Sequence, residues 1–251
     1  MNDNALFFVT HGSKDPRSWL ALQNFVTVAR TKDKKYKSGD RLISGGCLEG
    51  QELSLSQQLE QFAVEVIEKG ISEIAILPLF LLSGVHVSED IPAEVAIAQN
   101  NLPDKFTLRT TAYLGTNLQI PSLLLQHFEK YKTLHKIVAP PLGQPSQEGR
   151  ILMAHGSRRE GANQVVENLA NHSQAIAAYW GVEPKIETQI ELLLSQGFNT
   201  INVLPYFLTE GGLTEAIANK LKVFSDRAKI QQLPVPLSPE IIIDLMQSCD
   251  L

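Results

Sequence analysis

Residues 5–13 read ALFFVTHGS, and residues 150–157 read RILMAHGS. Each stretch is an apolar, strand-forming run that ends in His-Gly-Ser. A second matching pair follows in the same order, GISEIAILPLFL at residues 70–81 and GFNTINVLPYFL at residues 197–208. A single three-residue match would be weak evidence, but two matches in the same order indicate an internal duplication. The sequence therefore predicts two similar domains that face each other across a cleft.

Apolar runs alternate with helical periods through the first half of the chain. The expected strands cover residues 5–10, 41–48, 73–80 and 106–114, and the expected helices cover residues 17–29, 53–69, 89–99 and 120–131. This alternation is typical of an α/β fold in which helices cover both faces of a parallel sheet. We expect a parallel sheet of about four strands in each domain.

The segment at residues 139–149 is rich in proline and glycine and breaks both periods. It is the best candidate for a linker. The predicted organisation is an N-terminal domain, residues 1–138, that carries the active site, and a C-terminal domain, residues 150–251, that is a degenerate copy of it.

Composition excludes several classes of protein. The 251 residues are 43% hydrophobic and carry a formal charge of −5, whereas nucleic-acid binding needs a basic face. No apolar run reaches the roughly 18 to 20 residues that span a bilayer, and the N-terminus lacks a signal-peptide pattern. Two cysteines without a CxxC pair exclude a disulfide framework and a cysteine-ligated cluster. We expect a cytoplasmic protein, monomeric because a duplicated chain can build the paired architecture alone.

Three polar residues follow predicted strands. His11 follows the first strand, Glu49 the second and His86 the third. Ligands of open parallel sheets bind beyond the carboxyl ends of the strands, where these residues should lie. Two imidazoles and a carboxylate could hold a labile divalent metal or transfer protons near neutral pH. Either histidine alone could be a hydrogen-bonded structural residue, but their occurrence together favours a functional site.

The neighbours of these residues have structural explanations. Gly12 and Gly84 read as turn glycines that need an unusual backbone conformation. Glu89 and Asp90 read as acids at a helix N-terminus, where they interact favourably with the helix dipole. Cys47 reads as a small buried apolar residue.

The motifs together resemble the sirohydrochlorin chelatase family in its two-domain form. They are THGSKDPR at residues 10–17, Leu48-Glu49 ahead of residues 53–55, and LPLFLLSGVHVSEDIP at residues 77–92. The resemblance covers both halves and is most specific in the last segment. It implies ATP-independent insertion of Fe²⁺ or Co²⁺ into sirohydrochlorin, toward sirohaem or cobalamin, with no permanently bound cofactor.

The resemblance also implies roles for individual residues. His11 and His86 match the paired histidines that receive the metal and help take the pyrrole protons, and Glu49 matches the active-site acid. The substrate-binding residues that we expect from the resemblance are Ser13, Lys14, Arg17, Ser83, Gly84 and His155.

Sirohydrochlorin carries eight carboxylates, so an acidic protein needs local positive charge to bind it. Lys14, Arg17, Arg158 and Arg159 follow the two His-Gly-Ser turns and could supply that charge. Each of them taken singly could equally be a solvated residue at a helix start.

The second half departs from the site pattern. Counting from Pro205, Leu213 occupies the position of His86, and the position of Glu49 falls near Trp180. Only His155 is retained. The second domain is therefore predicted to be a wall of the cleft, with His155 as a turn residue or a contact to substrate carboxylates.

Two other functions fit parts of the pattern. Thr10-His11-Gly12 is faintly similar to the Arg-His-Gly of histidine phosphatases, but such a site needs arginines around a phosphate. A carrier that binds tetrapyrrole or metal without converting it would also have two α/β domains around a cleft. Histidine and carboxylate accept Fe²⁺, Co²⁺ and Ni²⁺ alike, so the sequence leaves the physiological metal open.

Overall fold

A computed structural model describes residues 4–132 and 148–247 of the chain. It contains two four-stranded sheets with the strand orders β2-β1-β3-β4 and β6-β5-β7-β8, and all strand pairs are parallel. The α/β class and the four-stranded parallel sheets predicted from the sequence are confirmed.

The first half provides β1 (Ala5–Gly12), α1 (Pro16–Lys32), α2 (Lys34–Lys37), β2 (Leu42–Glu49), α3 (Leu55–Glu68), β3 (Glu73–Pro78), the π-helix η1 (His86–Asp90), α4 (Ile91–Asn101), β4 (Thr107–Thr110), the short 3₁₀ helix η2 (Leu114–Thr116) and α5 (Ile120–Lys132). The second half provides β5 (Glu148–Ala154), α6 (Gln164–His172), β6 (Ile176–Tyr179), α7 (Ile186–Ser195), β7 (Thr200–Pro205), α8 (Gly212–Leu221), the 3₁₀ turn η4 (Lys222–Phe224), β8 (Lys229–Gln232) and α9 (Pro239–Gln247).

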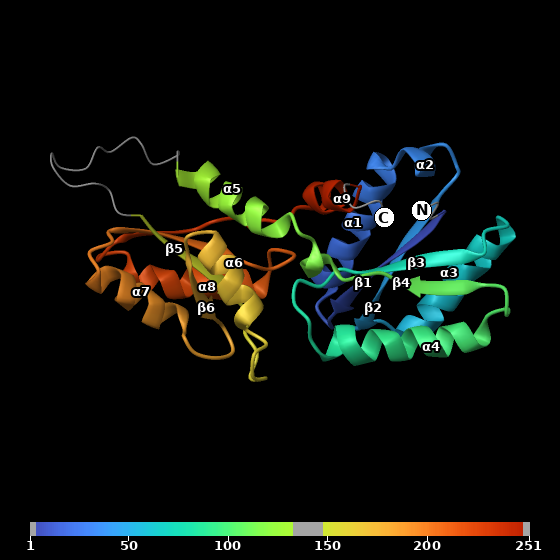
Figure 1. The fold of residues 1–251 in the computed structure, drawn as a ribbon, viewed down its shortest axis with the longest axis horizontal. Helices are drawn as coiled ribbons and strands as arrows, with labels where there is room; N and C mark the ends of the chain where they lie inside the picture. Colours follow the sequence, from blue (N-terminus) through green and yellow to red (C-terminus); the bar gives the residue numbers. More distant parts are fainter. Residues whose placement is uncertain (1–3, 133–147, 248–251) are drawn as a thin grey trace. The chain divides into compact units, whose positions relative to one another are not determined.

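Both faces of the first sheet are covered by helices. Helices α3 and α4 pack on one face, and α1 and α9 pack on the other (Figure 1). Alternate residues of β1 point to the two faces: Phe7 joins the α3 and α4 core, and Phe8 lies beneath α1 and α9. Because both faces are buried, the strand reads in the sequence as a continuous apolar run.

Local signals start the helices that follow the first two strands. Asp15 accepts a hydrogen bond from the backbone N–H of Arg17 and caps α1, with Pro16 at the first position of that helix. Ser54 and Gln57 form a capping box at the start of α3. These caps fix the point where each chain segment turns from its strand into its helix.

The second sheet repeats the first. Helices α7 and α8 pack on one face and α5 and α6 on the other (Figure 1). Pro78 pairs with Val9 in the first sheet, and Pro205 pairs with Met153 at the corresponding place in the second. The shared strand order and register are consistent with an internal duplication.

The chain divides into two compact units whose bounds differ from the predicted ones. The first unit combines Met1–Asn117 with Leu237–Leu251, and the second is Leu118–Pro236. Helix α5 therefore belongs with the second unit and α9 with the first. Most of the predicted linker lies outside the described residues, and Glu148 and Gly149 already belong to β5.

Side-chain contacts explain this division. Helix α9 packs on α1, and the ammonium of Lys32 lies 3.0 Å from the carboxylate of Asp244. In the second unit, Glu129 of α5 forms an ion pair with the buried Arg150 of β5. Each sheet is thus covered by one helix from the other half of the sequence, which a single boundary at residues 139–149 does not capture.

No helix among residues 4–132 and 148–247 is long and apolar enough to cross a membrane.

Candidate active site

The strand order brings His11 and His86 together. The chain runs from β1 to β2 on one side and places β3 on the other side of β1. The order of the strands thus reverses between β1 and β3, and ligands of open parallel sheets generally bind beyond the carboxyl ends of the strands at such a point. His11 lies at the end of β1, and His86 begins the π-helix after β3. Their ring centroids are 4.4 Å apart with the planes at 82°, so the structure brings the two predicted histidines together.

Each imidazole uses its Nδ1 atom in a hydrogen bond. His11 Nδ1 lies 2.8 Å from the carbonyl oxygen of Gly12, and His86 Nδ1 lies 2.7 Å from a carboxylate oxygen of Asp90. A carbonyl and an ionised carboxylate only accept hydrogen bonds, so both Nδ1 atoms carry the proton. In the neutral rings this leaves the lone pair on Nε2. Both Nε2 atoms can therefore bind a metal ion or accept a proton.

Solvent reaches both rings. His11 is exposed, and the side chains of His86 and Asp90 are 38% and 45% exposed. The aromatic ring of Phe80 lies 6.3 Å from the His86 ring, centroid to centroid, and the apolar side chain of Val85 is also partly exposed. The site thus combines two open nitrogen ligands with neighbouring apolar surface.

Glu49 lies at the end of β2, paired in register with Gly12, and is exposed. The described residues contain no group of three or more histidine, cysteine or carboxylate side chains placed to hold a metal ion. The structure therefore does not place Glu49 with the two imidazoles as a third metal ligand, which was one of the two roles that the sequence left open for this group of residues. Glu49 is an exposed carboxylate at the end of β2, the strand that pairs with β1.

The backbone conformation at position 12 requires a glycine. Its φ of +76° lies in the left-handed region, and a Cβ atom there would stand 2.1 Å from the carbonyl oxygen of Glu49 and 2.9 Å from the sulfur of Cys47. The prediction for Gly12 is confirmed, as is burial of Cys47, which also raises the pKa of its thiol. Gly84 differs: its φ is not in that region, and a Cβ would meet nothing within 4 Å. The turn explanation was wrong for Gly84.

Gly12→Ala should therefore destabilise the protein, and Gly84→Ala should not. Left-handed strain at a non-glycine residue costs about 1–3 kcal/mol, and the overlap with the Glu49 carbonyl adds to it. We expect Gly12→Ala to lower the melting temperature by at least about 5 °C, measured by circular dichroism. Gly84→Ala should melt within about 2 °C of the parent. Equal melting temperatures would show that the β1 turn tolerates a side chain.

The residues expected to bind substrate in the first unit have mixed surroundings. Ser13 accepts a hydrogen bond from the N–H of Asp15 and donates one to Ser18, so it stabilises the turn. Arg17 forms a 2.8 Å ion pair with Asp15, and its hydrogen bonds lower the pKa of the Asp15 carboxyl. Lys14 and Ser83 are exposed. The ammonium of Lys14 is exposed to solvent, whereas the guanidinium of Arg17 is paired with the carboxylate of Asp15.

The second unit retains one histidine of the pair. His155 is exposed at the end of β5, and its Nδ1 lies 3.2 Å from the carbonyl oxygen of Gly156. Leu213, at the position of His86, packs with Trp180 against the apolar core. The register pairs Ala154 with Tyr179, as it pairs Thr10 with Cys47, so the counterpart of Glu49 is Gly181. The predicted asymmetry between the halves is therefore present in the structure.

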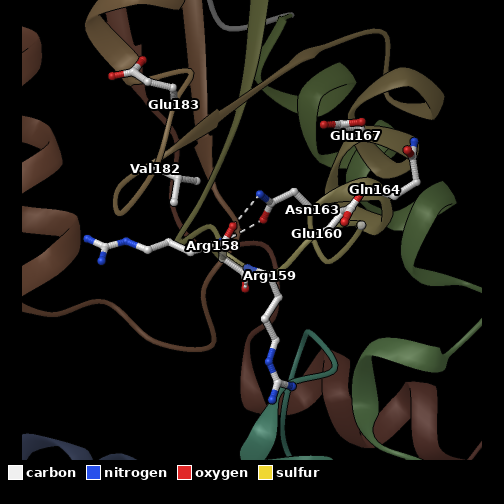
Figure 2. Close-up of a pocket in the computed structure, with 10 residues that line it drawn as sticks. Arg158, Arg159, Glu160, Asn163, Gln164, Glu167, Val182 and Glu183 are labelled. Atoms are coloured by element: carbon white, nitrogen blue, oxygen red, sulfur yellow. Dashed lines mark hydrogen bonds between the residues drawn. The ribbon is translucent and has the colours of Figure 1, made fainter.

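A cavity of about 500 Å³ adjoins the His155 turn, within the second unit (Figure 2). The side chain of Asn163 holds together the loop between residues 157 and 163. It accepts a hydrogen bond from the N–H of Ser157 and donates one to the carbonyl oxygen of the same residue. Arg158 and Arg159 both line this cavity but point in different directions (Figure 2). The other charged residues that line it are Glu160, Glu167 and Glu183. The two arginines thus share the cavity with three carboxylates, which offsets the positive charge expected there.

The contact of Asp90 with His86 was not predicted from the sequence. The position of Asp90 before a helix indicated an acid that interacts with the helix dipole, but its side chain makes no capping hydrogen bond to α4. The available signal was the spacing of four residues, which places two helical side chains on one face.

Fold and site together define a duplicated α/β protein with one pair of imidazoles at the switch point of its first sheet. The chain belongs to the CbiX family, whose model matches residues 5–131 and 149–242.

Named relatives are similar to this chain in sequence, and solved structures are similar to it in fold. A sirohydrochlorin ferrochelatase of Priestia megaterium is 24% identical over 234 residues, which are 90% of this chain and 81% of that protein. A sirohydrochlorin cobaltochelatase of Methanosarcina barkeri is 31% identical over 93 residues, 37% of this chain and 64% of that protein. The structure of SirB from Bacillus subtilis with Fe³⁺ matches with a TM-score of 0.73 at 18% identity, covering 97% of this chain and 94% of that one. A CbiX structure, described as the terminal enzyme for siroheme biosynthesis in denitrifying bacteria, matches with a TM-score of 0.64 at 19% identity, covering 98% of each chain.

Proposed function

We propose that this protein is a sirohydrochlorin chelatase that inserts Fe²⁺ or Co²⁺ into sirohydrochlorin without ATP, toward sirohaem or cobalamin. The observation that carries the proposal is the pair His11 and His86, with ring centroids 4.4 Å apart and both Nδ1 atoms engaged by acceptors. The family and the named ferrochelatase and cobaltochelatase relatives support it. The metal is a substrate here.

The residue types suit a metal that must be released. Metal insertion requires that the ion lose water, reach one face of the ring and exchange for two N–H protons. Two neutral imidazoles bind a divalent first-row ion through Nε2 and leave the other coordination positions open. Thiolates would hold such an ion more tightly and oppose transfer. A pair of nitrogen ligands without a third protein ligand is therefore suited to delivery.

Proton removal can use the same nitrogens. Once the ion moves to the pyrrole nitrogens, the Nε2 atoms of His11 and His86 are free to accept the two displaced protons. Glu49, exposed at the end of the neighbouring strand, offers a carboxylate as a further acceptor. Both histidines are open to solvent, so the protons pass on to water and the site is restored. The charge balances, because one divalent ion replaces two protons.

Glu49→Gln is expected to slow insertion by about 10²-fold, the typical effect of removing a proton-transfer group. The amide has the size of the carboxylate, and Glu49 is exposed, so folding should be unaffected. The measurement is steady-state insertion of Co²⁺, with circular dichroism as the control for folding. A turnover number within a factor of two of the parent would remove Glu49 from the mechanism.

An absorbance assay separates the proposal from a non-catalytic carrier. Protein, sirohydrochlorin and either Fe²⁺ or Co²⁺ are mixed with the tetrapyrrole in large excess. A chelatase converts many equivalents at a rate proportional to protein concentration. A carrier gives a change that saturates at one equivalent, and a protein of another class gives none.

The chain is further proposed to act as a monomer, because its duplicated sequence provides both units within one chain. Light scattering coupled to size-exclusion chromatography should then give a mass near 27.8 kDa. Its location in the cytoplasm stays a prediction from the sequence.

A further inference from the structure

We propose that Asp90 is a positioning residue that fixes the tautomer and the orientation of the His86 imidazole. Its carboxylate holds the proton on Nδ1, so that Nε2 presents its lone pair to the metal beside His11. The catalytic consequence of this inference rests on the proposed function, whereas its structural content does not.

The contact between the two side chains is close and local. Asp90 Oδ2 lies 2.7 Å from His86 Nδ1, the short end of the range for a charge-assisted hydrogen bond. The residues are the first and last of the π-helix His86–Asp90, in which the N–H of Ile91 bonds to the carbonyl of His86. Single π-helical turns occur frequently at functional sites.

The Asp90 carboxylate does not cap helix α4, although its position before that helix suggests this role. Asp90 precedes α4, yet its side chain forms no capping hydrogen bond to that helix. Ser54, by comparison, forms a full capping box at the start of α3. The carboxylate of Asp90 instead faces the imidazole, so the structure assigns it to the site.

His86 depends on a side chain for this constraint, and His11 does not. The Nδ1 of His11 bonds to the backbone carbonyl of Gly12, which every substitution at that position retains. The Nδ1 of His86 bonds to a side chain. An unconstrained neutral imidazole can carry its proton on either nitrogen, and the hydrogen bond at one nitrogen decides which. Without Asp90, a proton on Nε2 would block the metal-binding lone pair.

The direct test is the tautomer of His86 in the full-length protein without metal. Long-range ¹H–¹⁵N correlation spectra distinguish a proton on Nδ1 from one on Nε2, and His86→Ala identifies the signals. We expect the Nδ1–H form in the parent protein and in Asp90→Asn, whose amide oxygen still accepts the bond. Asp90→Ala should lose this preference. The matched control Glu89→Ala removes the same charge from the preceding exposed residue and should leave the tautomer unchanged.

The second readout is Co²⁺ binding, followed by its visible spectrum without tetrapyrrole. Removing a partner of a metal-ligating histidine typically costs about 10–100-fold in metal affinity or activity. Asp90→Ala should show a loss of that size, Asp90→Asn a smaller one, and Glu89→Ala none. An Nε2–H form of His86 in the parent, or an unchanged tautomer and Co²⁺ affinity in Asp90→Ala, would overturn the inference. If the tautomer responds as expected but the parent protein inserts no metal, the proposed function fails and the positioning role stands.

Discussion

Alanine at His11 or at His86 is expected to reduce metal insertion by about 10³-fold or more, because each change removes a metal ligand together with a proton acceptor. His155→Ala is expected to leave kcat nearly unchanged. The structure motivates this difference: His11 and His86 lie with their ring centroids 4.4 Å apart, whereas the counterpart of His86 in the second unit is Leu213, which packs against the core. A lone imidazole provides one ligand for the ion and accepts one proton.

His155→Ala is a closely matched control for His11→Ala. Both histidines are exposed at the end of the central strand of a sheet, and both bond through Nδ1 to the carbonyl of the next glycine. The measurement is steady-state insertion of Co²⁺ and Fe²⁺ by the three variants under identical conditions. If His155 contacts the substrate carboxylates, its loss raises KM and leaves kcat unchanged. Equal losses of kcat in His11→Ala and His155→Ala would show that one catalytic centre uses both histidines.

Ile243→Lys in the C-terminal helix is expected to unfold much of the N-terminal unit. Ile243 is 4% exposed and lines a small cavity under α9 with Leu6 and Phe8 of β1. The buried Arg41 lines the same cavity together with Asp33, its ion-pair partner at 2.7 Å, so the new ammonium would be buried where the neighbouring carboxylate is already paired. An uncompensated buried charge costs about 3–5 kcal/mol, a large part of the roughly 5–15 kcal/mol that stabilises a domain.

Asp244→Lys places the same side chain one residue later, at a position that is 64% exposed. It removes a surface ion pair with Lys32 and should cost about 1 kcal/mol or less. Hydrogen exchange with mass spectrometry shows where stability is lost. Strands β1 to β4 should exchange faster in Ile243→Lys, and β5 to β8 should keep their protection. Faster exchange confined to β5–β8 would mean that α9 belongs to the second unit.

The α/β class, the repeat and the residues that follow each strand could be predicted from the order of amino acids alone. Strands such as residues 5–9 are buried on both faces of a parallel sheet, so they appear in the sequence as continuous apolar runs. The turn at Gly12 was also predicted, because a glycine directly after an apolar strand is typical of a left-handed turn position. The apolar strand and the turn that ends it are both encoded by residues adjacent in the sequence, so a local pattern predicts them.

Which of those residues come into contact depends on how the strands are ordered in the folded sheet. Strand order places β3 beside β1 and so brings His86 to His11, and no periodicity encodes the order of strands in a sheet. The same holds for α5 and α9, each of which covers the sheet formed by the other half of the sequence. Asp90 bonds to His86 and does not cap α4, because the π-helical turn brings its carboxylate to Nδ1 of His86 and not to the backbone of α4. These outcomes depend on contacts between segments and on side-chain geometry, which the order of residues specifies only through the folded chain.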